Sequence, residues 1–164
     1  MKRSFSQTGF AALGLIALAG AVVSAVYFSK PDKAGALFQP DNASIVAQGK
    51  EIYAANCASC HGDNLEGQPN WRSPDADGYL PAPPHDKSGH TWHHPDEALF
   101  GLTKLGVVKY ANLKDHKSNM PAYEDILSDD EIIAVLSYIK STWPKDIREM
   151  HDQRNAIAAQ RKKG

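Results

Sequence analysis

Apolar residues recur at the three- and four-residue spacing of an α-helix in separate segments of this chain. The first such segment covers about residues 43–56, and Asp41 or Asn42 can cap its start by accepting free N–H bonds. Its apolar positions are Ile45, Gly49, Ile52 and Tyr53. Because glycine is unfavourable inside a helix, Gly49 indicates a place where another backbone approaches closely.

A second helix is predicted to start at His94-Pro95-Asp96-Glu97 and to stop at Gly106. Proline suits the first helical position, and the two acids favour the positive end of the helix dipole. The expected inner face consists of Ala98, Leu99, Leu102 and Leu105.

The clearest helix signal follows Ser128, where Ser128-Asp129-Asp130-Glu131 forms a capping box. Its apolar positions are Ile132, Val135, Leu136 and Ile139, and Trp143-Pro144 closes the helix. Residues 145–161 predict a further polar helix. In residues 62–84 few apolar residues recur at any regular spacing, and residues 107–119 are irregular. Strand patterns are almost absent along the chain, so the sequence predicts an all-α fold.

The N-terminus carries a short positive region, Met1-Lys2-Arg3, followed by an uncharged run from Gly9 to Phe28. This run is long enough to span a bilayer, which favours a signal anchor, whereas Val23-Ser24-Ala25 also suits a cleaved signal peptide. Under either interpretation the rest of the chain is exported to the periplasmic side of the membrane. We therefore assign residues 1–28 to the anchor or signal peptide, 29–40 to a linker and 41–144 to the main domain.

The charge distribution separates the body of the protein from its tail. The whole chain has a formal net charge of −1, which does not suggest nucleic-acid binding. Residues 29–144 hold 10 Lys/Arg and 16 Asp/Glu, whereas residues 145–164 hold 6 and 3. An acidic body with a weakly basic tail is compatible with a partner steered by charge, or with solubility alone.

The chain has only two cysteines, and they lie in the motif Cys57-Ala58-Ser59-Cys60-His61. Two thiols at this spacing can add to the two vinyl groups of haem, and the following histidine is then placed as an axial iron ligand. A thioredoxin-like dithiol would need a βαβ setting, and a structural zinc site would need four ligands at suitable spacing. Neither is visible, so the motif predicts one covalently bound haem c with its iron.

From about Asp41 to Trp143 the chain resembles the class I c-type cytochromes. The resemblance rests on the cysteine motif, on Met120-Pro121 in a loop, and on a C-terminal helix. Gly49 with Tyr53, and Tyr138 in the last helix, resemble the glycine–aromatic contact where the terminal helices of the family cross. The resemblance implies an all-α fold of three to five helices around the haem, serving one-electron transfer.

The second iron ligand is expected to be Met120, whose thioether matches the methionine ligand of the family, with His116 as the alternative. The family also implies that a carbonyl near a proline accepts the other ring N–H of His61. Pro69 is the nearest match, and Pro81, Pro83 and Pro84 are alternatives. Trp71 and Trp92 could donate indole N–H groups to the haem propionates or pack the core.

Four further histidines fall within ten residues: His85, His90, His93 and His94. They suggest either a second metal site, such as copper, or contacts with propionates, a helix cap and solvent.

The predicted function is that of an electron carrier rather than an enzyme, shuttling electrons between a redox donor and a redox acceptor. The N-terminal segment would tether it to the membrane, or the carrier would be soluble after cleavage of that segment. The alternative is the haem subunit of a periplasmic dehydrogenase, or an oxidoreductase with a displaceable axial ligand.

Overall fold

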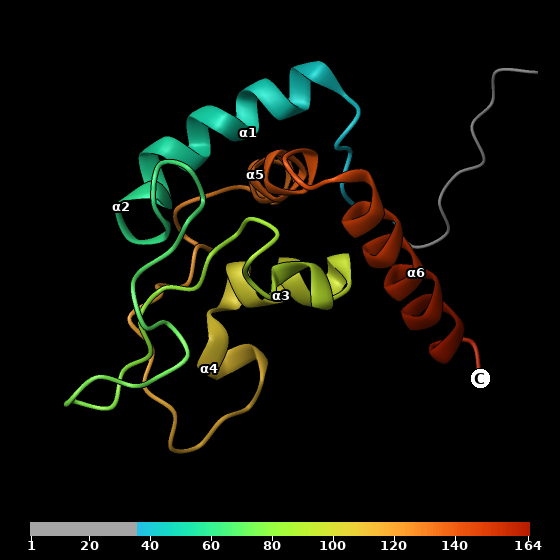
Figure 1. Cartoon of the computed structure of the whole chain (residues 1–164). Coiled ribbons are helices and arrows are strands. Elements are labelled where there is room, and N and C mark those ends of the chain that lie inside the picture. The colour runs from blue at the N-terminus through green and yellow to red at the C-terminus, as the bar shows by residue number, and fades with distance from the viewer. Residues whose placement is uncertain (1–35) are drawn as a thin grey trace, which may run out of the picture. The chain divides into compact units, whose positions relative to one another are not determined.

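The computed structural model describes residues 36–164, and the predicted N-terminal anchor or signal peptide lies outside this part. The described elements are all helical (Figure 1). They are α1 (Ala43–Asn56), α2 (Ala58–His61), the 3-10 helix η1 (Thr91–His93), α3 (Asp96–Leu105), α4 (Val107–Tyr110), α5 (Asp129–Ser141) and α6 (Lys145–Arg161). The all-α prediction is confirmed, because no strand occurs between residues 36 and 164.

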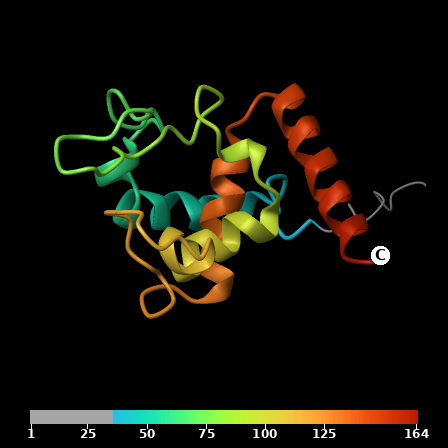
Figure 2. The same ribbon diagram turned by 90° about the horizontal axis from the view of Figure 1, so that it is seen from below.

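Helices α1 and α5 cross at Gly49, as the sequence predicts (Figures 1 and 2). A Cβ atom at Gly49 would lie 2.0 Å from the carbonyl oxygen of Ala134 in α5. Next to this crossing the rings of Tyr53 and Tyr138 pack at a centroid distance of 5.5 Å. The missing side chain therefore allows the two backbones to touch, and the aromatic pair packs beside them.

The ends of both helices follow their predicted caps. The side chain of Asn42 accepts hydrogen bonds from the N–H groups of Ser44 and Ile45 at the start of α1. Ser128 and Glu131 form the reciprocal capping box of α5.

Helix α3 begins at Asp96, one residue later than predicted, because Pro95 is the N-cap and its carbonyl accepts the first helical bond from Leu99. Its buried face also differs from the predicted one. Leu99 is buried as expected, but Ala98, Leu102 and Leu105 are only half-buried, and the other buried positions are Asp96, Gly101 and Thr103. Gly101 is buried because the ring of Tyr110, in the unpredicted short helix α4, packs directly against it.

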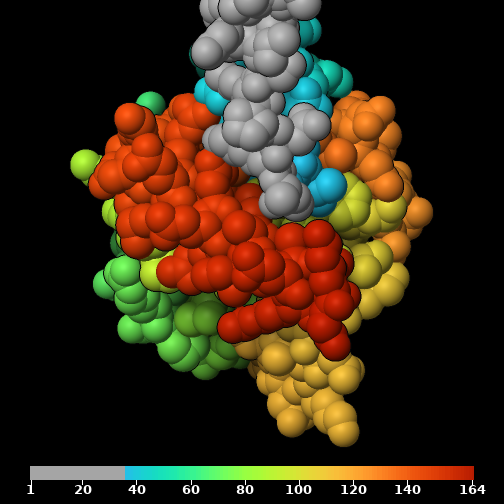
Figure 3. All heavy atoms as spheres, turned by 90° about the vertical axis from the view of Figure 1, so that its right-hand side faces the viewer, coloured from blue at the N-terminus to red at the C-terminus, as the bar shows by residue number. Residues whose placement is uncertain are grey.

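Helix α6 is the predicted C-terminal polar helix, and it packs against η1. In the space-filling view it forms a band across one face of the described domain (Figure 3). Its inner side buries two polar side chains, His151 and Asn155, instead of an apolar stripe. Polar contacts of its inner face therefore help to hold this helix on the domain.

The hydrophobic core is built around α1 and α5, with Ile132, Val135 and Ile139 at its centre. Phe38 joins this core from the segment before α1, so the end of the predicted linker packs against the domain. No helix within residues 36–164 is long and apolar enough to cross a membrane.

Candidate functional site

The two cysteines lie at the junction of α1 and α2. Cys57 caps the end of α1, and its carbonyl accepts hydrogen bonds from the N–H groups of Cys60 and His61 at 3.1 and 2.9 Å. Both thiols are free, Cys57 being half-buried and Cys60 exposed. Burial, followed by the proximity of Cys60, raises the pKa of the Cys57 thiol to about 11. A thioredoxin-like dithiol also needs a βαβ setting, and residues 36–164 contain no strand, so the site does not fit that alternative.

The ring of His61 is buried and oriented by a main-chain carbonyl. Its Nδ1 lies 2.8 Å from the carbonyl oxygen of Pro83. Because a carbonyl can only accept, Nδ1 carries the proton and Nε2 keeps the lone pair that a metal needs. The carbonyl thus belongs to Pro83, one of the sequence alternatives, and the nearest match by sequence, Pro69, was wrong.

The imidazole of His85 stacks on the imidazole of His61. Their ring centroids are 3.9 Å apart, and the ring planes differ by 18°. Burial, together with the neighbouring His61 and His90, lowers the pKa of His85 well below its ordinary value, so this ring is neutral at neutral pH. The sequence alone gave no reason to single out this contact.

Met120 is half-buried and packs against the hydrophobic core. It also lines an open groove of about 320 Å³, whose other walls include Leu105, Val107 and Ala122. His116, the alternative ligand, is exposed in the same loop.

Tyr123 connects the Met120 loop to the cysteine motif. Its hydroxyl donates a hydrogen bond of 2.8 Å to the carbonyl of Asn56, the residue that precedes Cys57. The main-chain N–H of Tyr123 donates hydrogen bonds to the carbonyls of Thr103 and Lys104 at the end of α3. The side chain is buried, and burial raises the pKa of its hydroxyl to about 12, so the hydroxyl stays a donor.

The loop after the motif is ordered by its own main-chain bonds, which the sequence did not predict. Gly67 donates to the carbonyl of His61 at 2.7 Å, and Gln68 donates to that of Ala82 at 2.8 Å. A second open groove, of about 300 Å³, lies along this loop. It is lined by Trp71, Arg72, Leu80, Pro81, Pro83 and His90.

The two tryptophans considered for propionate binding have other contacts in this structure. The ring of Trp71 has the Arg72 guanidinium 3.9 Å from its centroid and stacks with the ring of His90. The indole N–H of Trp92 donates to the carbonyl of Lys87 at 3.4 Å.

The clustered histidines are not arranged as a metal site. His90 stacks on Trp71 and meets the ring of His94 edge-on at a centroid distance of 5.5 Å. The other two lie elsewhere, His93 on Trp92 and His85 on His61. Among residues 36–164, no group of three or more His, Cys, Asp or Glu side chains is arranged to hold a metal ion.

The residues present nevertheless fit a covalently attached haem. Two free thiols, separated by two residues, have the sequence spacing that suits the two haem vinyl groups, and His61 offers a lone pair at Nε2. Met120 offers a soft sulfur beside an apolar groove. Thioether and imidazole are established axial ligands of haem iron.

A small all-helical protein with this motif and these ligand types belongs to the haem proteins that transfer electrons. The sequence model of the family "Cytochrome c" matches residues 46–143, and the chain belongs to this family. It therefore carries covalently bound haem c with iron, and its activity is haem-based electron transfer.

Two curated relatives support this assignment. The chain is 33% identical to cytochrome c6 of Cladophora glomerata over 100 residues, which cover 60% of this chain and 89% of the relative. It is 37% identical to the cytochrome c subunit of the cytochrome bc1 complex of Corynebacterium efficiens over 67 residues. That match covers 40% of this chain but only 22% of the relative. No solved structure matches the chain.

Proposed function

We propose that this protein is a single-electron carrier whose haem c is attached through Cys57 and Cys60 and ligated by His61 and Met120. Haem c supplies the one-electron couple of its iron. The observation that carries the proposal is the hydrogen bond from Tyr123 to Asn56, which ties the Met120 loop to the cysteine motif. This bond supports the proposal because it joins two segments, far apart in sequence, that carry proposed ligands.

The role of the protein chain would be to hold both ligands in place. Pro83 orients His61 through the Nδ1–H bond, and Tyr123 is held by hydrogen bonds to the end of α3 and to the end of α1. Two protein ligands would fill both axial positions, which favours a carrier over an enzyme with an open coordination site. Methionine ligation also favours the ferrous state and a raised reduction potential.

We further propose that the protein works on the periplasmic side of the cytoplasmic membrane, with residues 1–28 as anchor or cleaved signal. The positive residues before the apolar run support export of the part that follows. Residues 29–40 would connect this segment to a haem domain of residues 41–144, and residues 145–164 would form the added tail. Its partners would be a redox donor and a redox acceptor, and one relative named as a subunit of a bc1 complex supports a place near membrane redox enzymes.

The ligand assignment is tested by absorption spectra of the haem-loaded protein in both oxidation states. Met120→Ala is expected to remove the sulfur–iron charge-transfer band of the oxidised wild type, and His116→Ala is the matched control that keeps it. A low-spin spectrum that Met120→Ala leaves unchanged, but His116→Ala alters, would overturn the assignment.

A further inference from the structure

The orientation of His61 needs more than the carbonyl of Pro83. That hydrogen bond holds one atom of the ring, Nδ1, at 2.8 Å. A single such bond leaves the ring free to tilt about the bond. The only ring stacked face to face on His61 within residues 36–164 is that of His85, at 3.9 Å and 18°. A flat contact of this kind restricts the plane of the ring, which the hydrogen bond does not.

The main chain of His85 is fixed on both sides. Its N–H donates to the carbonyl of Leu65 at 2.8 Å. Its carbonyl accepts the indole N–H of Trp143 at 2.7 Å. Leu65 and Trp143 are both buried, so these two bonds hold the Cα of His85 in a rigid frame.

The side chain of His85 is held by ring contacts. Its buried Nδ1 has no hydrogen-bond partner among the described residues. Besides the stacking on His61, it meets the ring of Tyr53 edge-on at a centroid distance of 6.0 Å. Because this nitrogen makes no hydrogen bond, the ring is held in place by its two aromatic contacts alone.

We propose that His85 is a positioning residue that sets the ring plane of the His61 ligand by stacking on it. Trp143 supports this role by holding the main chain of His85 in place. The frame extends into α6, because the ring of Trp143 also packs against that of His151 at 5.0 Å. The plane of an axial imidazole determines how its orbitals mix with those of the iron, so it is visible in the paramagnetic resonance spectrum of the ferric state.

The test compares three variants of the protein loaded with its covalent haem. His85→Leu removes the ring, His85→Phe keeps a flat ring, and His93→Leu is the control at an exposed histidine that packs on Trp92. We expect His85→Leu to shift the g values of the low-spin ferric signal, His85→Phe to restore them to near the wild-type values, and His93→Leu to leave them unchanged.

The proposal is overturned if His85→Leu has wild-type g values, or if His85→Phe shifts them as much as His85→Leu. If His85→Leu takes up no haem, His85→Phe decides alone, since changed g values there would contradict positioning by a stacked ring. The inference rests on His61 being the proposed ligand. Failure of that assignment would appear separately in a further variant, because His61→Ala would then keep the low-spin signal of the wild type.

Discussion

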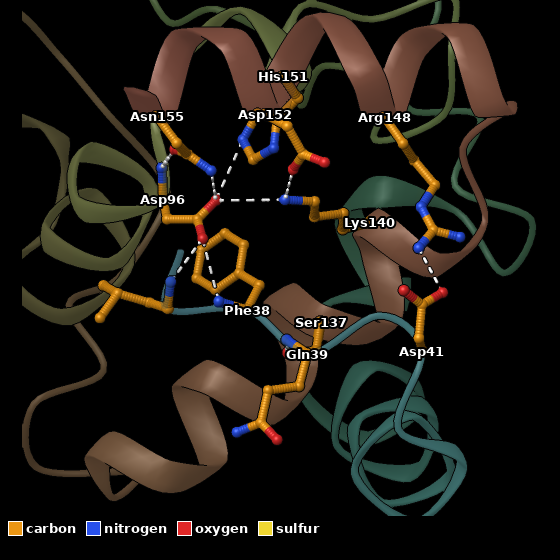
Figure 4. Close-up of polar contacts among 11 residues, drawn as sticks. Phe38, Gln39, Asp41, Asp96, Ser137, Lys140, Arg148, His151, Asp152 and Asn155 are labelled. Carbon is orange, nitrogen blue, oxygen red and sulfur yellow. Dashed lines mark hydrogen bonds and ion pairs between the residues drawn. The ribbon is translucent and has the colours of Figure 1, made fainter. Parts of the chain in front are cut away.

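Replacing Asp96 with asparagine is expected to lower the free energy of unfolding by about 3 kcal/mol, since breaking a buried ion pair costs roughly 3–5 kcal/mol. Asp96 is fully buried, at 0% exposure, and lies at the centre of the polar contacts that join α6 to the domain (Figure 4). Its Oδ2 accepts the N–H groups of Leu37 and Phe38 at 2.7 and 3.0 Å. Its Oδ1 accepts the amide N–H of Asn155 at 2.8 Å.

The same carboxylate faces two basic side chains. Lys140 is 1% exposed, and its Nζ lies 3.8 Å from Asp96 and 2.7 Å from Asp152. Nε2 of His151 lies 3.4 Å from Asp96. Asparagine has only one acceptor oxygen. Its NH₂ group must therefore face either the main-chain donors that now bind Oδ2 or the side-chain donors that now lie near Oδ1. We place the cost at the lower end of the range because Lys140 keeps Asp152.

The measurement is urea unfolding of the haem-loaded protein followed by far-ultraviolet circular dichroism, compared at equal m values. Glu149→Gln is the matched control, because it removes a carboxylate from an exposed ion pair with Lys145 on α6. That change is expected to alter stability by at most about 0.5 kcal/mol. A loss below about 1 kcal/mol for Asp96→Asn would refute the importance of the buried network, since one ordinary hydrogen bond contributes as much.

Three further predictions follow from the fold. Gly49→Ala should destabilise the protein by about 2–3 kcal/mol in the same assay, because the new methyl group would lie 2.0 Å from the carbonyl oxygen of Ala134. An unchanged midpoint of urea unfolding would show that α1 and α5 can separate freely. Tyr123→Phe should cost about 1 kcal/mol and weaken the sulfur–iron band on warming, because the bond to Asn56 is lost; full retention of both would argue against this role of Tyr123. Burial lowers the pKa of His151 from 6.5 to about 4. Between these two pH values the unfolded chain therefore binds more protons than the folded chain, so stability should fall as the pH drops from 6.5 to about 4. The plot of unfolding free energy against pH should be less steep in His151→Gln. Equal slopes in the two proteins would contradict His151 as the cause.

Local signals in the sequence predicted those parts of the fold that depend on neighbouring residues. The caps at Asn42 and Ser128 and the glycine stop at Gly106 all act within a few residues, and each is found in place. The crossing at Gly49 was also predictable, because a glycine in an amphipathic helix indicates close backbone contact.

Features that depend on distant partners could not be predicted in this way. Asp96 reads as an ordinary acid at a helix start, whereas its burial depends on Asn155 and Lys140 in two later helices. His151 has no motif around it, and its burial follows from the packing of a helix with few apolar residues.

In the candidate site, too, features set by nearby residues could be predicted and features set by distant partners could not. Cys57, Cys60 and His61 could be selected from residue type and spacing, whereas Met120 was selected through the family resemblance. The role of all four as haem residues stays a prediction. Proximity in sequence selected Pro69 as the carbonyl partner of His61, but the partner in the structure is Pro83. The reason is that the loop folds back on itself through main-chain hydrogen bonds before it reaches His61. The stacking of His85 depends on that same loop path, so no sequence pattern indicated it.

The most direct test of the central claim is a potentiometric titration of the purified haem-loaded protein, followed by its absorption spectrum. An electron carrier with two protein ligands should give one reversible one-electron transition and low-spin spectra in both states, with no change when carbon monoxide is added to the reduced form. A high-spin spectrum in either state, or rapid carbon monoxide binding, would reveal an open iron and contradict the account.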